Sequence, residues 1–487
     1  MDLLLTHGYF LYEDPKELQI MKPYVPLGIL YISSHLRAKG WDVEIFDTTF
    51  STREELFRLL RSSPPAVLGI YANLMTRGNV IDILRAGKEA GWKTIVGGPE
   101  PGTYIEEYLG AGADVVVVGE GEVTTEELLA VFRDGRPGAA DRATELTRIN
   151  GIAFRALDGS VCRTPPRDQI SNLDAQPWPD RDAVDIGRYL RAWREAHGQG
   201  SVSLITARGC PYRCRWCSHG VYGMTHRRRR PAAVVDEIEW LLDRYQPDMA
   251  WLADDVFTIH HGWLARYAAE MKERGLRIPF ECISRADRLS PPVMDLLAEL
   301  GCFRIWIGSE SGSQRVLDAM ERGVTVEQVR AAVALAKARG IRTGMFLMWG
   351  YSGEDIDDIE ATINHVKHSD PDVFFTTVSY PIKGTPYFEE VASRVVSSKP
   401  WKESSDRDFG IRGRHSRRFY QYADELLGLE VDLNRLTEGA LAERRGASPG
   451  RPTPESATAI ACRIADLRQK IGEARDGLRS SFAEVEV

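Results

Sequence analysis

The sequence lacks long apolar runs: none approaches the ~20 consecutive apolar residues that span a membrane. Its start also lacks a basic region followed by an apolar core and a cleavage site, so Met1 to His7 is interpreted as a first strand and not a signal peptide. These absences predict a cytoplasmic protein that has no membrane partner.

An excess of one charge sign is also missing. The chain has 62 Lys and Arg against 70 Asp and Glu, a formal net charge of −8. Such mild acidity gives no general attraction to nucleic acid or to anionic membranes. One basic run, Arg227 to Arg230, stands out; it is interpreted as a solvated or structural face, with a substrate phosphate or carboxylate as the alternative. No aromatic platform is interleaved with it, so nucleic acid is not a predicted partner.

Cysteine is scarce and odd in number. Seven cysteines in 487 residues argue against a disulfide framework. Four of them are scattered, as buried small side chains often are. The other three, Cys210, Cys214 and Cys217, lie within eight positions and need a chemical explanation.

The apolar pattern predicts an α/β fold. Continuous Val and Ile runs separated by helical patterns up to about residue 140 are typical of a parallel sheet covered on both faces. Such an open α/β domain, Rossmann-like in type, binds its ligand at the carboxyl ends of its strands. The predicted strands are Leu3–Leu5, Val43–Phe46, Val67–Ile70, Thr94–Val96 and Val115–Val118.

The rest of the chain divides further. Residues 141–200 are predicted to be a connector that holds a hairpin at Ile152–Arg155 and Val161–Arg163. Residues 201–390 show six strand–helix repeats and predict a partial (β/α)6 barrel with function at the C-terminal strand ends. Residues 391–487 are predicted to be helical, with a linker near 446–454. The predicted barrel strands are Val202–Ile205, Met249–Leu252, Phe280–Ile283, Arg304–Ile307, Thr343–Met348 and Val373–Val378.

The three clustered cysteines follow the first barrel strand with the spacing Cys-x3-Cys-x2-Cys. Thiolates this close can converge on one soft metal centre, and iron–sulfur clusters are usually held by Cys. Three ligands on a four-iron cluster leave one iron open. The alternative is a structural zinc site with His219 or His226 as the fourth ligand, although no second Cys pair accompanies the loop.

The loop, with Trp216 as its aromatic residue, resembles the signature of the radical S-adenosylmethionine (SAM) superfamily. The resemblance spans about residues 200 to 390. It implies a 4Fe–4S cluster on the three cysteines, an open iron that chelates SAM, and reductive cleavage of SAM to a 5′-deoxyadenosyl radical. It also implies an external electron donor of the flavodoxin or ferredoxin type.

Further cofactor contacts are expected by position. Asp254 and Asp255 end the second barrel strand, where the superfamily often contacts the SAM amino group; helix capping is the alternative. Arg285 is predicted to pair with the SAM carboxylate, and Glu310, in a Gly-Ser-Glu-Ser-Gly run, to reach the SAM methionine or ribose; a structural ion pair is the alternative for both. The predicted cofactor-binding residues of the barrel are Tyr212, Trp216, Asp254, Asp255, Arg285 and Glu310.

The N-terminal domain carries glycine-rich strand ends, which let backbone approach a ligand closely. Their order, Gly-Gly-Pro and then Gly-Glu-Gly-Glu upstream of the cysteine loop, together with Pro26–Leu30, resembles cobalamin-dependent radical SAM enzymes. That group includes methyltransferases and the anaerobic cyclase of bacteriochlorophyll synthesis. The residues predicted to bind cobalamin are Asn73, Leu74, Met75, Gly97, Gly98, Pro99, Glu100, Gly119, Glu120, Gly121 and Glu122.

One feature departs from other cobalamin proteins: the chain has no Asp-x-His-x-x-Gly motif to supply a lower-axial histidine. The loop Tyr71 to Thr76 takes the position that faces the lower side of the corrin. Loss of the histidine is common in the group that this chain resembles, so cobalamin stays the predicted cofactor; a degenerate domain that no longer binds it is the alternative.

The resemblance implies methylation of an unactivated carbon of a small, natural-product-like molecule. The alternatives are the same radical chemistry without methyl transfer, giving cyclisation, rearrangement or dehydration, and a zinc-stabilised binding protein. The segment Asp406 to Tyr422 mixes basic and aromatic residues and is interpreted either as a cover of the barrel mouth or as a packing surface for a helix.

Overall fold

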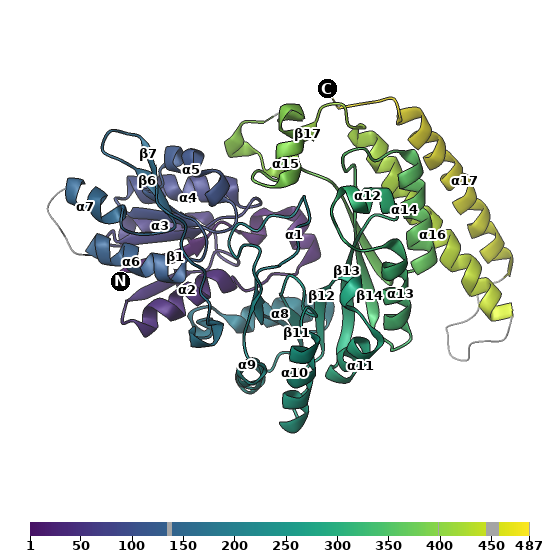
Figure 1. The fold of residues 1–487 in the computed structure, drawn as a ribbon, viewed down its shortest axis with the longest axis horizontal. Helices are drawn as coiled ribbons and strands as arrows, with labels where there is room; N and C mark the ends of the chain where they lie inside the picture. Colours follow the sequence, from purple (N-terminus) through teal and green to yellow (C-terminus); the bar gives the residue numbers. More distant parts are fainter. Residues whose placement is uncertain (134–138, 398, 445–456, 487) are drawn as a thin grey trace. The chain divides into compact units, whose positions relative to one another are not determined.

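The computed structural model describes residues 1–133, 139–397, 399–444 and 457–486 (Figure 1). Contacts divide the chain into two compact units. The first comprises Met1–Tyr212, Cys217–Phe280 and Ser398–Asp408, and the second comprises Arg213–Trp216, Glu281–Ser397 and Phe409–Val487. The division falls within the cysteine loop, so each unit is built from segments far apart in sequence. The linker predicted near 446–454 lies outside the described residues.

The first unit contains the predicted N-terminal sheet. Its strands are hydrogen-bonded in the order β2-β1-β3-β4-β5-β6-β7. Strands β1 to β5 pair in parallel, and β6 and β7 continue the sheet as the predicted antiparallel hairpin, which is thereby confirmed. The strands are β1 (Leu3–His7), β2 (Val43–Phe46), β3 (Val67–Tyr71), β4 (Lys93–Gly97), β5 (Val115–Val117), β6 (Ile152–Arg155) and β7 (Val161–Arg163).

Alternation along the strands explains why both faces of this sheet are covered. In β1, Leu4 packs with α3, α4 and α5, whereas its neighbours Leu3 and Leu5 pack with α2 and α6. The apolar runs read from the sequence therefore form two cores, one on each face. The helices of this unit are α1 (Pro15–Ile20), α2 (Leu27–Ala38), α3 (Arg53–Ser62), α4 (Arg77–Glu89), α5 (Ile105–Ala111), α6 (Glu122–Arg133), α7 (Ala139–Leu146) and α8 (Ile186–His197).

The second sheet contains the six predicted barrel strands, in the order β15-β14-β13-β12-β11-β8. Pairing is parallel between β8 and β11 and along β13, β14 and β15, as the strand–helix repeat predicts. The strands are β8 (Ser201–Leu204), β11 (Met249–Leu252), β12 (Phe280–Ser284), β13 (Cys302–Glu310), β14 (Arg342–Trp349) and β15 (Val373–Val378). The helices between them are α9 (Pro231–Tyr245), α10 (His261–Glu273), α11 (Pro291–Leu300), α12 (Gln314–Ala319), α13 (Val326–Lys337) and α14 (Ile356–Ser369).

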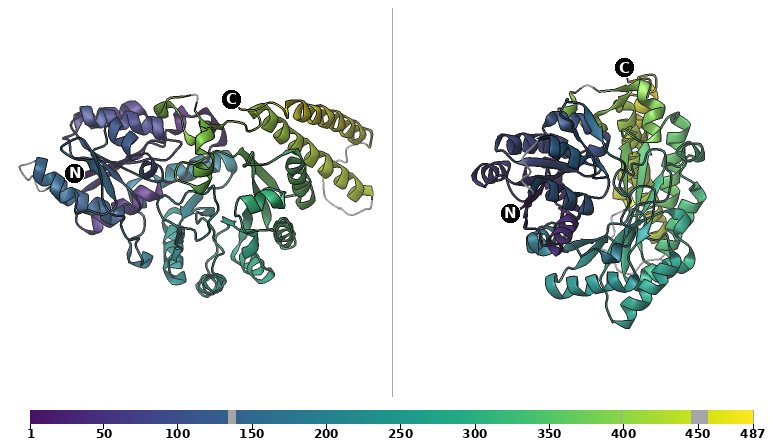
Figure 2. Two further views of the ribbon diagram at one scale, coloured as in Figure 1. Left: turned by 45° about the horizontal axis from the view of Figure 1, so that its top comes forward. Right: turned by 60° about the vertical axis from the view of Figure 1, so that its left-hand side comes forward.

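The C-terminal region is largely helical, as predicted. After β15 come α15 (Pro386–Val391) and the antiparallel pair β16 (Val395–Val396) and β17 (Gly410–Ile411). Two long helices, α16 (Arg417–Arg444) and α17 (Ala457–Ser481), then lie side by side, as Figure 2 shows. Within the described residues, no helix combines the length and the apolar character that crossing a bilayer demands.

Candidate functional site

The cysteine loop is closed at its base by a short hairpin. Strand β9 (Ala207–Arg208) leads into the loop and pairs antiparallel with β10 (Arg227–Arg228), which leads out of it. Gly209, the first loop residue, has a φ of 85°, and a Cβ there would lie 2.2 Å from the carbonyl oxygen of Thr225. Glycine is therefore required where the chain turns out of β9.

Asp254 supports this base from the end of β11. Its buried carboxylate accepts hydrogen bonds from the backbone N–H groups of Thr206, at 2.7 Å, and Ala207, at 3.1 Å. It also accepts from the Thr206 hydroxyl, and Arg228 contacts it at 3.2 Å. Asp254 thus shapes the turn before the cysteines, whereas its neighbour Asp255 is exposed. Contact of either residue with SAM stays a prediction.

Two arginines of the second unit face the thiol of the buried Cys214. Its Sγ lies 3.9 Å from Nη1 of Arg285 and 3.8 Å from Nη1 of Arg322. Arg285 is in turn fixed by Asp287 at 2.9 Å and by the carbonyl oxygen of Arg322 at 2.8 Å. Two guanidinium groups so close to Cys214 place positive charge beside a sulfur that can ligate a metal. The donor set therefore fits an anionic iron–sulfur cluster.

Glu310 ends β13 beside the same arginines. It has a φ of 61° and follows a break in the strand register at Gly308. Its carboxylate lies 3.6 Å from Nε of Arg322, and burial raises the pKa of Glu310 above its ordinary value. Gly308 permits this arrangement, because a Cβ there would lie 2.6 Å from Arg322 and 2.7 Å from Glu310.

The aromatic residue of the loop packs into the second unit. Trp216 contacts an apolar cluster that includes Met320, Met348, Tyr351 and Tyr387. The preceding residue of the loop, Arg215, is held by backbone hydrogen bonds to Met320, at 3.1 Å, and to Tyr387, at 3.0 Å. Tyr212, the other predicted aromatic contact, is half-buried in the first unit. Cys210 is half-buried and Cys217 is exposed.

The residues predicted to bind cobalamin follow β3, β4 and β5, whose carboxyl ends share one sheet edge. At this edge Gly98 has a φ of 117°, and a Cβ there would lie 2.3 Å from the carbonyl oxygen of Ala72, so two strand-end loops pack flat against each other. The Asn73 side chain accepts hydrogen bonds from the N–H groups of Met75 and Thr76 and so fixes the loop after β3. Closely approaching, fixed backbone suits a broad ligand.

The carboxylates in these glycine motifs are occupied by protein partners. Glu100 accepts from Arg77 Nε at 2.5 Å and from the Tyr108 hydroxyl at 2.6 Å. Arg77 is 1% exposed, pairs also with Asp406 at 2.8 Å and lies over the ring of Tyr104. This network ties the strand-end loop to residues 401–408, so the Glu100 side chain has a structural use.

Glu120 and Glu122 bind the arginines that flank the cysteine loop. Arg208 reaches Glu120 at 2.7 Å and Glu122 at 2.6 Å, and Arg227 reaches Glu120 at 2.7 Å. Burial disfavours the charge of Arg208, but the carboxylates, together with Tyr222, outweigh it and raise the pKa of Arg208 above its ordinary value. The Gly-Glu-Gly-Glu motif thus connects the N-terminal sheet to the base of the cysteine loop.

Sequence reasoning missed Arg322 and the partners of the motif glutamates. Arg322 lies in no motif and reaches Cys214 from the turn that follows α12. Arg227 belongs to the basic run that was interpreted as a solvated or structural face; it is structural, because Arg227, Arg228 and Arg229 are paired with Glu120, Asp254 and Glu237, whereas Arg230 is exposed.

The histidines proposed as zinc ligands show no preformed site. His226 stacks on His260 with 5.0 Å between ring centres, and burial lowers the pKa of His226 to about 4. Among the described residues, no three His, Cys, Asp or Glu side chains are already grouped to hold a metal ion. Cys214 with its two arginines is therefore the best-defined part of a cluster site.

Two family models match the chain. Residues 204–366 match the radical SAM superfamily, and this range includes the whole cysteine loop. Residues 20–129 match the B12 binding domain, and this range includes the strand-end loops after β3, β4 and β5. Each match covers the region whose motifs carried the corresponding resemblance in the sequence.

Two curated relatives align over most of this chain. An uncharacterized methyltransferase of Pyrococcus horikoshii is 29% identical over 403 residues, which cover 80% of this chain and 83% of the relative. The anaerobic magnesium-protoporphyrin IX monomethyl ester cyclase of Rubrivivax gelatinosus is 26% identical over 387 residues, which cover 77% of this chain and 68% of the cyclase.

A solved structure shares the fold. The radical S-adenosylmethionine methyltransferase TsrM from Kitasatospora setae, with cobalamin and a 4Fe–4S cluster bound, superposes with a TM-score of 0.65. The match has 21% sequence identity and covers 83% of this chain and 80% of TsrM. The predicted fold class, with a cobalamin-type α/β domain, a partial barrel and a helical C-terminal region, is confirmed.

Proposed function

Because the chain belongs to the cobalamin-dependent radical SAM enzymes, we propose that it transfers a methyl group to an unactivated carbon of a small, natural-product-like molecule. Its cofactors are a 4Fe–4S cluster, SAM and cobalamin. The observation that carries the proposal is the presence of both family domains in one chain whose overall similarity extends to a methyltransferase.

The cofactors supply a hydrogen-abstracting radical and a transferable methyl group when they are bound. The protein contributes position and charge. Cys210, Cys214 and Cys217 are proposed to hold the cluster, and Arg285 and Arg322 to balance its negative charge at Cys214.

Two further groups are proposed to hold the loop in place. Asp254 fixes the turn that precedes the cysteines, and Glu120 with Glu122 holds Arg208, which directly precedes Gly209. Each acts on backbone or on another side chain, so each is a positioning residue. The N-terminal loops at Asn73, Gly98 and Gly119 are proposed to receive cobalamin.

The test is anaerobic reconstitution with iron, sulfide, cobalamin, SAM and a reductant, followed by mass spectrometry of candidate substrates. We expect a product heavier by one methylene group, together with 5′-deoxyadenosine. Replacing the three loop cysteines with alanine is expected to abolish iron binding and reductive SAM cleavage together. Retention of SAM cleavage in that variant contradicts the assignment of the loop.

The second candidate function is radical chemistry without methyl transfer, which the match to the magnesium-protoporphyrin cyclase favours. In that case 5′-deoxyadenosine forms and the product gains no methylene. Metal analysis of the anaerobically purified protein separates both candidates from a zinc-stabilised binding protein. A flavodoxin or ferredoxin as electron donor and a cytoplasmic location stay predictions.

A further inference from the structure

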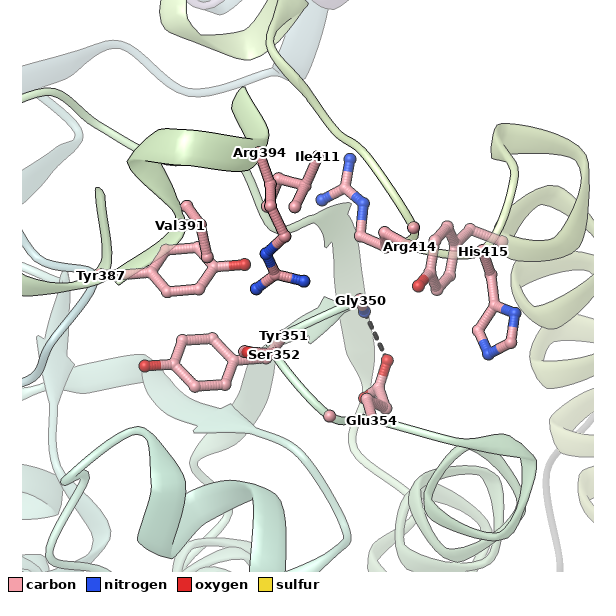
Figure 3. Close-up of a pocket in the computed structure, with 13 residues that line it drawn as sticks. Gly350, Tyr351, Ser352, Glu354, Tyr387, Val391, Arg394, Ile411, Arg414 and His415 are labelled. Atoms are coloured by element: carbon pink, nitrogen blue, oxygen red, sulfur yellow. Dashed lines mark hydrogen bonds between the residues drawn. The ribbon is translucent and has the colours of Figure 1, made fainter. Parts of the chain in front are cut away.

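The second unit contains a cavity of about 250 Å³ beyond the carboxyl end of β14. The loop Gly350 to Glu354 forms one wall, α15 and the segment after it form the next, and the segment from β17 to Tyr420 forms the third (Figure 3). This is the end of a β/α barrel strand, where such folds place ligands. The volume suits part of a small molecule and is well above that of one water molecule.

Buried polar atoms line this cavity without partners. Oε1 of Glu354 and Nε of Arg414 have no hydrogen-bond partner among the described residues, although both groups are shielded from solvent. The Tyr387 hydroxyl, also in the lining, is buried without a hydrogen-bond partner among the described residues, although Ser379 lies beside it. Buried polar groups are nearly always satisfied, so several in one cavity indicate a missing ligand or ordered water.

The lining consists mainly of hydrogen-bond donors. Burial raises the pKa of Glu354 to about 8, so its carboxyl group is largely protonated and donates at neutral pH. The other oxygen of Glu354 accepts from the N–H of Gly350. Arg414 keeps Nε available while its terminal nitrogens bind Glu486, at 3.1 Å, and the carbonyl oxygen of Ser379. Figure 3 shows the guanidinium of the exposed Arg394 turned toward the Tyr387 hydroxyl.

The cavity adjoins the cysteine loop. Tyr351 and Tyr387 form part of its wall, and both belong to the apolar cluster against which Trp216 packs. Their rings stack with 4.5 Å between centres, and the N–H of Tyr387 donates to Arg215 of the loop. The wall of the cavity therefore contacts the cysteine loop directly at Tyr387.

We propose that this cavity binds the acidic end, a carboxylate or a phosphate, of the small molecule on which the enzyme acts. Donors from Arg394, Arg414 and Tyr387 converge there, and such groups bind acidic oxygens strongly. The identification of the ligand as the substrate rests on the proposed function. Binding of an acidic group in the cavity is measured separately, without turnover.

The experiment is chemical footprinting of arginine in the anaerobic holoenzyme. Phenylglyoxal modifies accessible guanidinium groups, and peptide mass spectrometry reports each site. Inorganic phosphate and acetate are the two probes, each compared with chloride at equal ionic strength. We expect one of them to slow modification of Arg394 several-fold, and the more effective probe identifies the acid. Arg412 directly follows β17, is exposed and lies outside the lining; it is the matched control and is expected to be unaffected.

Two further arms make the result decisive. The Tyr387→Phe variant removes one donor while retaining the ring. In this variant the modification rate of Arg394 with the probe is expected to rise toward the rate measured in chloride. Equal protection of Arg394 and Arg412, unchanged protection in Tyr387→Phe, or no protection by either probe overturns the proposal. Protection by SAM alone also overturns it, because the cavity would then belong to the SAM site. Loss of methylation with intact protection contradicts the proposed function and leaves the acid site standing.

Discussion

The charge networks of the first unit and the cavity of the second use the same residue types in opposite ways. In the first unit, Arg208 binds both Glu120 and Glu122, and none of these three side chains has a buried polar atom without a partner. Arg227 also binds Glu120 but leaves its Nε and Nη2 unpartnered among the described residues. In the second, Glu354 is buried and Arg414 is half-buried, yet each leaves one buried polar atom without a partner among the described residues. A closed network fixes structure, whereas an open set of donors is available to a ligand.

The largest effect is expected from opening the closed network. Arg208→Ala leaves the buried carboxylate of Glu122 without its arginine and leaves Glu120 with Arg227 alone, so it is expected to lower the free energy of unfolding by roughly 3–5 kcal/mol. Chemical denaturation of the anaerobic protein measures it. Arg230→Ala is the control, because Arg230 is 78% exposed and pairs with Asp174 on the surface; its loss is expected to stay below about 1 kcal/mol. Similar losses in both variants would contradict the distinction.

The cavity predicts a pH effect. With a pKa of about 8 in the folded protein, Glu354 retains a proton that the unfolded chain has released. The wild type therefore loses up to roughly 1.4 kcal/mol of stability per pH unit between about pH 5 and pH 8 from this group. Glu354→Gln removes that dependence, so the variant gains on the wild type as pH rises. Unfolding free energies across this range test the sign.

A matched variant guards this pH test. Glu327 lies exposed on α13, where its carboxylate keeps its hydration in the folded state. Glu327→Gln is the exposed counterpart, and the gain of the variant over the wild type with rising pH is expected to be larger for Glu354→Gln than for Glu327→Gln. Equal behaviour of the two variants would show that the carboxyl group of Glu354 is not held protonated by burial.

Glycines of the two regions sharpen the comparison at a smaller scale. Gly350 has a φ of 71°, and a Cβ there would lie 2.8 Å from the ring of Tyr420, so Gly350→Ala is expected to cost roughly 1–3 kcal/mol. Gly121 has no such φ, and the atom nearest to its added Cβ would be the terminal methyl of Ile32, at 2.7 Å. Because that methyl can shift, Gly121→Ala is expected to cost less in the same thermal-unfolding experiment.

The smallest effect is expected where a hydroxyl is unpaired. Tyr387→Phe removes a buried group that makes no hydrogen bond, so stability is expected to change by less than about 1 kcal/mol or to rise. Tyr108→Phe is the contrast, because its hydroxyl donates to Glu100 at 2.6 Å; removing it is expected to cost roughly 1.5–3 kcal/mol. If Tyr387→Phe costs more than Tyr108→Phe, the cavity is not an open set of donors.

Much of the fold followed from local pattern. The Val and Ile runs located the strands of both sheets, and the turn residues located the hairpin of β6 and β7. The cysteine spacing led to the cofactor class because three thiols within eight residues form a local feature. Contacts between distant side chains could not be predicted in this way. Arg322 and Cys214 are 108 positions apart, and no sequence motif contains both.

The glycine motifs show the same limit of sequence-based prediction within a few residues. Gly98 and Gly119, which are expected to let backbone approach a ligand closely, both have positive φ, and their contact with cobalamin stays a prediction. The intervening glutamates were assigned to the cofactor with them, yet Glu120 binds Arg208 at 2.7 Å and Glu100 binds Arg77 at 2.5 Å. A short motif indicates where the backbone needs glycine, but it does not predict which residue pairs with a charged side chain.

By itself, the sequence determined the two parallel α/β regions, their order and the position of the cysteine loop, because the spacing of apolar residues, glycines and cysteines acts over a few residues. Only the tertiary structure decided which buried charges close on each other and which remain available, as at Glu120 and Glu354. The reason is physical: the strength of an ion pair or of an unpaired donor depends on burial and distance, and folding sets both by bringing together residues tens to hundreds of positions apart.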